Sequence, residues 1–192
     1  MGDCKLKDFW KLNGYEISDL LNKKEVSATE ICNNLITHIE NTNPKINAIV
    51  VETYEDAKKQ AKILDKKIKE GQKTGLLAGI PTTIKVNTDQ IGYPSTNGLR
   101  IQKDLIAKKD SPVVKNLRNS DALMLGKTNT PAFSIHWFTR NSLHGHTLNP
   151  HNKNITPGGS SGGAAAATAA GMGAIGHGTD IAGSIRYPAY AC

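Results

Sequence analysis

Residues 157–171 restrict the fold more than any other segment, because nearly every side chain in them is small. They read PGGSSGGAAAATAAG. Glycines let the backbone turn tightly, and the lack of bulk lets the serine hydroxyls approach another segment closely. The alanine run that follows favours a helix ending near Gly171. The sequence therefore predicts a tight turn that leads directly into a closely packed helix.

The N-terminal third is predicted to be mainly helical. Ser27 and Glu30 have the spacing of a capping box, and Val26 and Ile31 have that of a hydrophobic staple. The helix that they begin should end before Pro44, because the residue before a proline disfavours helical geometry. A short β-like run follows at residues 46–51, and a second helix is predicted over residues 54–70.

From residue 75 onward, short apolar strands alternate with helices. Strands are predicted over residues 82–86, 122–125 and 174–178, with a loop over 179–188, and helices are predicted to begin at Ser111-Pro112 and at Thr130-Pro131. This alternation is typical of an α/β protein. We expect one domain, with a helical part over residues 1–73 and an α/β core over residues 74–192.

The basic charge is better explained by a solvated surface than by nucleic-acid binding. The chain has 192 residues and a formal net charge of +7, from 24 Lys and Arg against 17 Asp and Glu. Only four of the basic residues are arginines, the side chain that nucleic-acid binders use for phosphate and base contacts. In the helix over residues 54–70, the lysines lie mostly outside one apolar stripe. The stripe consists of Ala57, Ala61, Leu64 and Ile68.

Neither membrane insertion nor secretion is indicated. The chain has no run of about 18 apolar residues, and its N-terminus turns polar directly after residues 1–4. Its three cysteines, Cys4, Cys32 and Cys192, are odd in number and have no short spacing, which argues against a disulfide framework or a zinc ribbon. We expect a cytoplasmic protein that contacts neither membrane nor nucleic acid, and a homodimeric assembly stays open.

A phosphate-binding loop and a metal centre are weaker interpretations of the remaining motifs. The P-loop motif needs a glycine ahead of Gly126-Lys127-Thr128 at the position of Asp121, and residues 158–163 contain no lysine. The clustered histidines lack the usual ligand spacing, because His144 and His146 are two apart with no cysteine nearby. The other two are His136 and His151. We expect surface or structural histidines and no metal.

The serines offer a different chemistry. Ser184 follows Gly183 in the loop after the last predicted strand, where a serine can act as a nucleophile near backbone amides. A hydroxyl nucleophile needs a base, and Lys85 at the end of a predicted strand can serve if burial keeps it neutral. From spacing alone, a glycine linker and a buried structural lysine explain the pattern equally well.

Three blocks of the chain resemble the amidase signature family of serine hydrolases. They are AGIPTTIKVN at residues 78–87, GKTN at 126–129, and the whole of residues 156–189, which begins with TPGGSSGG and ends with GTDIAGSIRYPA. The resemblance extends over roughly residues 10–192. It implies a mixed β-sheet flanked by helices in three layers, and no metal or organic cofactor.

The resemblance implies a Ser–cis-Ser–Lys triad. In it, Ser184 attacks the amide carbonyl and forms an acyl-enzyme. Ser160, joined to its preceding residue by a cis peptide bond, passes the proton between Ser184 and Lys85. Lys85 then returns the proton to the leaving amine.

The resemblance also assigns residues around the triad. The N–H groups of Ile181, Ala182, Gly183 and Ser184 would form the oxyanion hole. Ser161, Asp180 and Arg186 would support the site, the last two as a charge pair.

This sequence departs from the family pattern at three points. Ala182 stands where glycine is usual, and its methyl group would crowd the loop if the residue needs a positive φ. Val86 replaces an acidic residue. Family members continue past the position of Cys192, so we expect the fold to be incomplete at the C-terminus.

The resemblance implies an amidase that hydrolyses the C–N bond of a small-molecule amide. Two alternatives remain. One is the amidotransferase subunit that frees ammonia from glutamine for misacylated tRNA, and the other is a catalytically inactive truncated product. The lack of a partner-binding signature and the histidine-rich residues 142–151 favour a stand-alone amidase.

Overall fold

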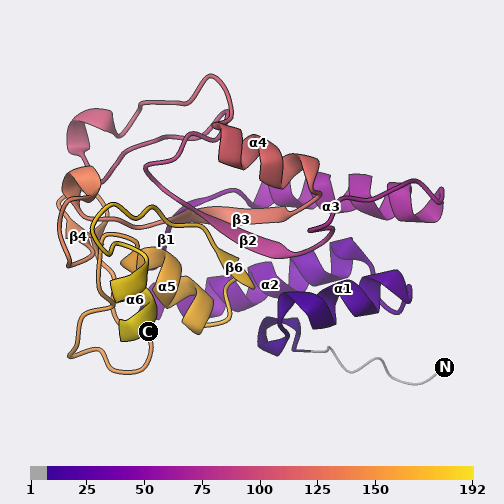
Figure 1. The fold of residues 1–192 in the computed structure, drawn as a ribbon, viewed down its shortest axis with the longest axis horizontal. Coiled ribbons are helices and arrows are strands. Elements are labelled where there is room, and N and C mark those ends of the chain that lie inside the picture. Colours follow the sequence, from indigo (N-terminus) through magenta and orange to yellow (C-terminus); the bar gives the residue numbers. More distant parts are fainter. Residues whose placement is uncertain (1–7) are drawn as a thin grey trace.

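A four-stranded mixed sheet lies at the centre of the computed structural model, which describes residues 8–192 (Figure 1). The strands are β1 (Ile49–Glu52), β2 (Pro81–Lys85), β3 (Leu123–Thr128) and β6 (Ile175–Gly176), in the spatial order β1-β3-β2-β6. β1 is antiparallel to β3, whereas β2 is parallel to both β3 and β6.

Helices cover both faces of this sheet. In Figure 1, α4 (Pro112–Asn119) lies above the sheet, and α1 (Gly14–Asn22) and α2 (Ala28–Thr42) lie below it. Successive residues of β3 point to opposite faces of the sheet. Leu123 lies in the larger core, together with residues of α1, α2, α3 (Tyr54–Lys69) and α5 (Gly162–Ala169). Met124 lies on the other face and packs with α4. The predicted fold class, a mixed sheet flanked by helices in three layers, is confirmed.

Local sequence signals place several helices correctly. The Ser27 side chain accepts from the Glu30 N–H, and the Glu30 side chain accepts from the Ser27 N–H, as the predicted capping box requires. α2 ends at Thr42, ahead of Pro44. α3 begins and ends within a residue of its predicted bounds, and α4 begins at Pro112 after the Ser111 cap, as predicted.

Other predictions are wrong in detail. Thr130-Pro131 opens only a 3-10 turn, Ala132–Ser134, because Phe133 and Ser134 both have a φ of 57° and cannot continue an α-helix. The predicted loop over residues 179–188 contains the start of α6 (Arg186–Ala191). The strand predicted over residues 122–125 continues to Thr128 and so contains Gly126-Lys127-Thr128.

The remaining short elements surround the sheet. Three further 3-10 turns span Phe9–Lys11, Asn43–Lys45 and Arg100–Gln102. A hairpin of β4 (Arg140–Asn141) and β5 (Gly145–His146) lies beside the start of β1 and the end of β3, since Asn47 and Asn129 both bond to its backbone.

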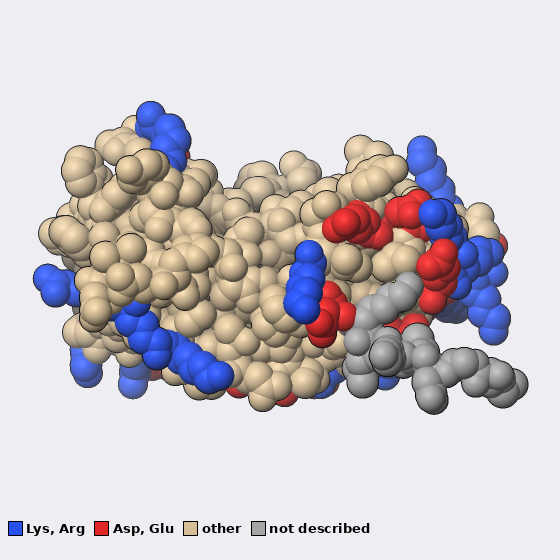
Figure 2. All heavy atoms as spheres, turned by 90° about the horizontal axis from the view of Figure 1, so that it is seen from below, with Lys and Arg blue, Asp and Glu red and all other residues tan. Residues whose placement is uncertain are grey.

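Charged side chains do not form one continuous basic surface on the face shown in Figure 2. Lys and Arg lie mainly toward its two ends, with acidic side chains among them at one end. Basic and acidic side chains also lie side by side nearer the middle of an otherwise largely uncharged stretch. No helix within residues 8–192 is long and apolar enough to cross a membrane. Cys32 and Cys192 are free thiols, whereas Cys4 and the polar N-terminal residues lie outside the described part.

Candidate active site

Lys85 ends β2 and is fully buried, with its side chain surrounded by hydroxyl groups. Its Nζ donates to Ser160 Oγ at 2.7 Å, to Thr179 Oγ1 at 2.9 Å and to Ser161 Oγ at 3.0 Å. Burial lowers the pKa of Lys85 to about 8, against which the negative charge of Asp180 acts weakly. About a tenth of Lys85 is therefore neutral at pH 7, far more than at the ordinary pKa of 10.5, and a general base must be neutral to accept a proton.

The loop that carries Ser160 packs against a second backbone segment. The Gly159–Ser160 peptide bond is cis, and Ser160 is buried. A Cβ built at Gly159 would lie 2.5 Å from the carbonyl oxygen of His136 and 2.7 Å from the carbonyl carbon of Trp137. Only glycine fits at position 159, because the neighbouring atoms belong to the backbone and cannot rotate away.

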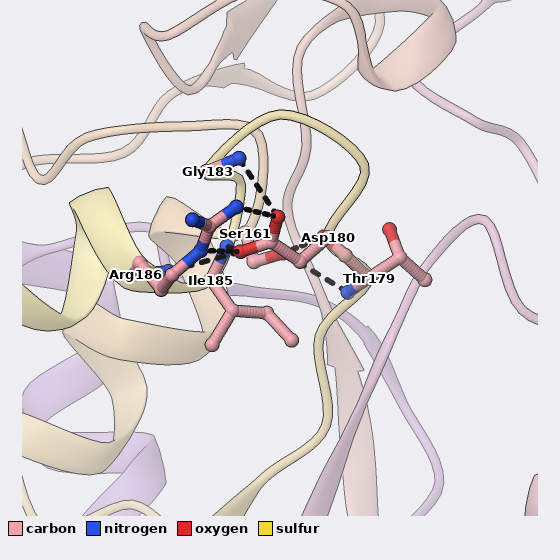
Figure 3. A network of polar contacts seen from close by, with 6 residues as sticks. All are labelled: Ser161, Thr179, Asp180, Gly183, Ile185 and Arg186. Atoms are coloured by element: carbon pink, nitrogen blue, oxygen red, sulfur yellow. Dashed lines mark hydrogen bonds and ion pairs between the residues drawn. The ribbon is translucent and has the colours of Figure 1, made fainter.

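Ser161 connects this loop to the loop that carries Ser184. Its backbone N–H donates to the carbonyl oxygen of Ser184 at 3.0 Å. Its hydroxyl accepts from Lys85 Nζ and from the Thr179 N–H, and it donates to the Thr179 carbonyl oxygen at 3.3 Å. The two serine loops are thus held together through the backbone and the side chain of one residue, and its bond with the Thr179 N–H is drawn in Figure 3.

Asp180 organises the loop between β6 and α6 (Figure 3). Its carboxylate accepts from the N–H groups of Gly183, at 2.7 Å, and Ile185, at 3.0 Å, and forms an ion pair with Arg186 at 2.9 Å. These hydrogen bonds, that from Arg186 foremost, hold the pKa of Asp180 well below its usual range. The structure thus contains the charge pair that the sequence predicts.

The candidate oxyanion loop is largely open. Within residues 8–192, the N–H groups of Ile181, Ala182 and Ser184 have no acceptor, whereas the Gly183 N–H is taken by Asp180. The positive φ of this loop, 101°, falls on Gly183 and not on Ala182, so the alanine methyl group imposes no backbone strain. Ser184 is half-buried, and its hydroxyl contacts no hydrogen-bonding group of the described residues.

Two neighbours of Lys85 were missed by sequence reasoning. Thr179 lies inside the GTD motif without a predicted role, although its hydroxyl is one of the three that Lys85 contacts. His177 follows β6, and its N–H donates to the carbonyl oxygen of Thr83. Burial, aided by the charge of Lys85, lowers the pKa of His177. The position of His177 directly before the GTD motif was the sequence signal that could have placed it near the site.

A second buried lysine stands apart from the serines. Lys127 is fully buried, and burial lowers its pKa to about 8 as well. In the pairing of β2 with β3 it lies beside Ile84, however, and its Nζ donates to the carbonyl oxygen of Pro94 at 2.7 Å and to Ser95 Oγ at 3.4 Å. Lys85 alone of these two lysines meets Ser160.

The histidines have separate surroundings. His144 Nε2 contacts Thr96 Oγ1 at 2.8 Å, and His151 Nε2 contacts the carbonyl oxygen of Cys192 at 2.6 Å. In the part of the chain that the structure describes, no group of three or more His, Cys, Asp or Glu side chains could hold a metal ion.

Comparison with known proteins connects this geometry to a family. The family model described as Amidase matches residues 30–192. The chain is 45% identical over 181 residues to an indoleacetamide hydrolase from Bradyrhizobium diazoefficiens, a match that covers 94% of this chain and 34% of that protein. It is 40% identical over 185 residues to a glutamyl-tRNA(Gln) amidotransferase subunit from Fusobacterium nucleatum subsp. nucleatum, a match that covers 96% of this chain and 38% of that one.

Solved structures agree. A bacterial aryl acylamidase of the amidase signature family matches with a TM-score of 0.89 at 38% identity, over 94% of this chain and 37% of that one. This chain spans between 34% and 38% of the lengths of these three relatives. With a family match over most of its residues, the chain belongs to the amidase family.

Proposed function

We propose that the chain carries the catalytic groups of an enzyme that hydrolyses a carboxylic amide through an acyl-enzyme. The contact between Lys85 Nζ and Ser160 Oγ at 2.7 Å is the observation that carries this proposal, because burial holds the pKa of this lysine at about 8. A lysine in that state can take a proton from a hydroxyl and later return it.

The reaction follows from these positions. Neutral Lys85 takes the Ser160 hydroxyl proton while Ser160 takes the proton of Ser184, whose Oγ attacks the amide carbonyl carbon. The free N–H groups of Ile181, Ala182 and Ser184 stabilise the negative oxygen of the tetrahedral intermediate, whereas the Gly183 N–H stays with Asp180. The C–N bond then breaks, and the proton passes from Lys85 through Ser160 to the leaving nitrogen. Water then attacks the ester carbonyl of the acyl-enzyme at Ser184. Its proton passes to Lys85 by the same route, and the carboxylic acid is released.

The contact between the hydroxyls of Ser160 and Ser184 is not made in the free protein. Catalytic hydrogen bonds are often loose before substrate binds and tighten in the complex. The bond from the Ser161 N–H to the Ser184 carbonyl oxygen keeps the two loops adjacent. We therefore expect substrate to close this last link of the proton path.

The relatives suggest the substrate class. One is named an indoleacetamide hydrolase, which favours a small-molecule amide as the substrate. We further propose that the enzyme is cytoplasmic, acts alone and has no nucleic-acid partner. Another is named as part of a glutamyl-tRNA(Gln) amidotransferase, which favours release of ammonia from glutamine for misacylated tRNA. The stronger identity, 45% against 40%, favours the amidase. A homodimer stays open.

A fluorophosphonate probe tests the proposal directly, because it modifies an activated serine. We expect the chain to be labelled, Ser184→Ala and Lys85→Ala to lose labelling, and the exposed control Ser142→Ala to keep it. Comparing the rate of ammonia release from indole-3-acetamide with the rate from glutamine then distinguishes the two substrate classes. Equal labelling of Ser184→Ala would disprove the assignment, and no labelling of the folded chain would support an inactive product.

A further inference from the structure

The N-terminus of α5 lacks its usual cap. Ser161 occupies the N-cap position, but its side chain makes no capping hydrogen bond. A serine there normally accepts from an N–H of the first turn. The Ser161 hydroxyl is instead engaged by Lys85 and Thr179. The site uses the group that would cap the helix, so the buried N–H of Gly162 needs another acceptor.

Thr139 supplies that acceptor from a distant part of the chain. Its Oγ1 accepts from the Gly162 N–H at 3.1 Å and donates to the carbonyl oxygen of Gly158 at 2.8 Å. A hydroxyl has one proton to donate and lone pairs to accept with, so both bonds form at once. Thr139 is fully buried, and a Cβ at Gly162 would overlap with its Oγ1. One hydroxyl thus joins the two ends of the turn that contains Ser160.

A second buried threonine holds the middle of the same turn. Thr130 Oγ1 donates to the carbonyl oxygen of Ser160 at 3.0 Å, and Thr130 is fully buried. Its hydroxyl acts on the Ser160 backbone, whereas Lys85 contacts the Ser160 side chain. The Ser160 turn is therefore fixed at three backbone atoms by two side chains that contact neither Lys85 nor Ser184.

We propose that Thr139 and Thr130 are positioning residues that hold the Ser160 hydroxyl against Lys85, and that Thr139 does so by replacing the cap that Ser161 gives up. The inference rests on the proposed function, in which Ser160 passes the proton. Neither threonine touches substrate or the reacting atoms. Each acts through Ser160.

Three variants test Thr139. Thr139→Val keeps the shape and removes the hydroxyl, Thr139→Ser keeps the hydroxyl, and Thr53→Val is the matched control. Thr53 is a buried threonine whose hydroxyl donates to the Met124 carbonyl oxygen at 2.8 Å, away from the serines. We expect the rate constant of fluorophosphonate labelling to fall at least about tenfold in Thr139→Val, since a misplacement of about 1 Å can cost about a hundredfold. Thr139→Ser should recover most of the rate, and Thr53→Val should not lower it.

A second measurement needs no reaction. The titration of Lys85, followed by NMR of its ¹³Cε, reports the surroundings of Nζ. We expect its midpoint to move toward 10.5 in Thr139→Val, because water reaches a loosened site, and to stay unchanged in Thr53→Val. If Thr139→Val does not fold, Thr130→Val, which removes one donor, gives the same comparison.

The outcomes separate the two proposals. A wild-type chain that is not labelled, with a titration that still shifts in Thr139→Val, would contradict the proposed function and keep the positioning role. Labelling and titration in Thr139→Val that match those of Thr53→Val would overturn the positioning role.

Discussion

Replacing Lys85 with methionine should change how the stability of the chain depends on pH. In the unfolded chain the lysine has its ordinary pKa of 10.5, and in the folded protein burial lowers it to about 8. Between these values the unfolded state binds a proton that the folded state has released. The free energy of unfolding of the wild type therefore rises with pH in this window, and the methionine variant lacks that contribution.

The size of the effect follows from the shift. For a pKa that falls from 10.5 to about 8, the wild type should gain about 1.4 kcal/mol over Lys85→Met between about pH 7 and about pH 9. Lys127 contributes with the same sign, because its pKa is also lowered to about 8. Cys32 and Cys192, whose pKa values burial raises to about 11, act in the opposite direction above about pH 9. All three are common to both proteins and cancel in the difference.

Urea unfolding followed by tryptophan fluorescence at several pH values measures this difference. The lost hydrogen bonds of Lys85 add a constant offset, so only the change with pH is diagnostic. The control Lys62→Met removes an exposed lysine, and its difference from the wild type should stay constant. A flat difference between wild type and Lys85→Met from about pH 7 to about pH 9 would refute the claim that burial prepares Lys85 as a base.

Three further substitutions probe the loops and one helix. Gly159→Ala should destabilise the fold by about 1–3 kcal/mol in urea unfolding, because its Cβ would lie 2.5 Å from the carbonyl oxygen of His136; wild-type stability would show that the segment can move away. Asp180→Asn should slow fluorophosphonate labelling about tenfold. The substitution replaces charge-assisted bonds to Arg186 and the loop N–H groups with neutral ones, which are about half as strong. An unchanged rate would contradict the organising role of Asp180. Ser27→Ala should cost about 1 kcal/mol of stability through the lost cap and leave labelling unchanged, and a lower labelling rate would count against a purely local effect.

The helix caps could be read from the sequence because their interactions are local. Ser27 and Glu30 are three residues apart, and Ser111 caps the Val114 N–H over the same spacing. The Thr130-Pro131 start has an equally good local signal, yet no α-helix forms. The Phe133 N–H donates to the Asn97 carbonyl oxygen, so a contact remote in sequence accompanies the positive φ that stops the helix.

The sequence by itself determined the family and named Lys85, Ser160 and Ser184, because these residues stand in motifs whose order and spacing are specific. Only the tertiary structure decided how they meet. Lys85 Nζ bonds to Ser160, whereas Lys127, which pairs with Ile84 across β2 and β3, bonds to the carbonyl oxygen of Pro94, although both lysines are equally buried. Thr139, which caps α5, lies 23 residues from Gly162, the residue whose N–H it accepts. Burial and long-range hydrogen bonds depend on packing between distant segments, and sequence spacing carries no information on that packing.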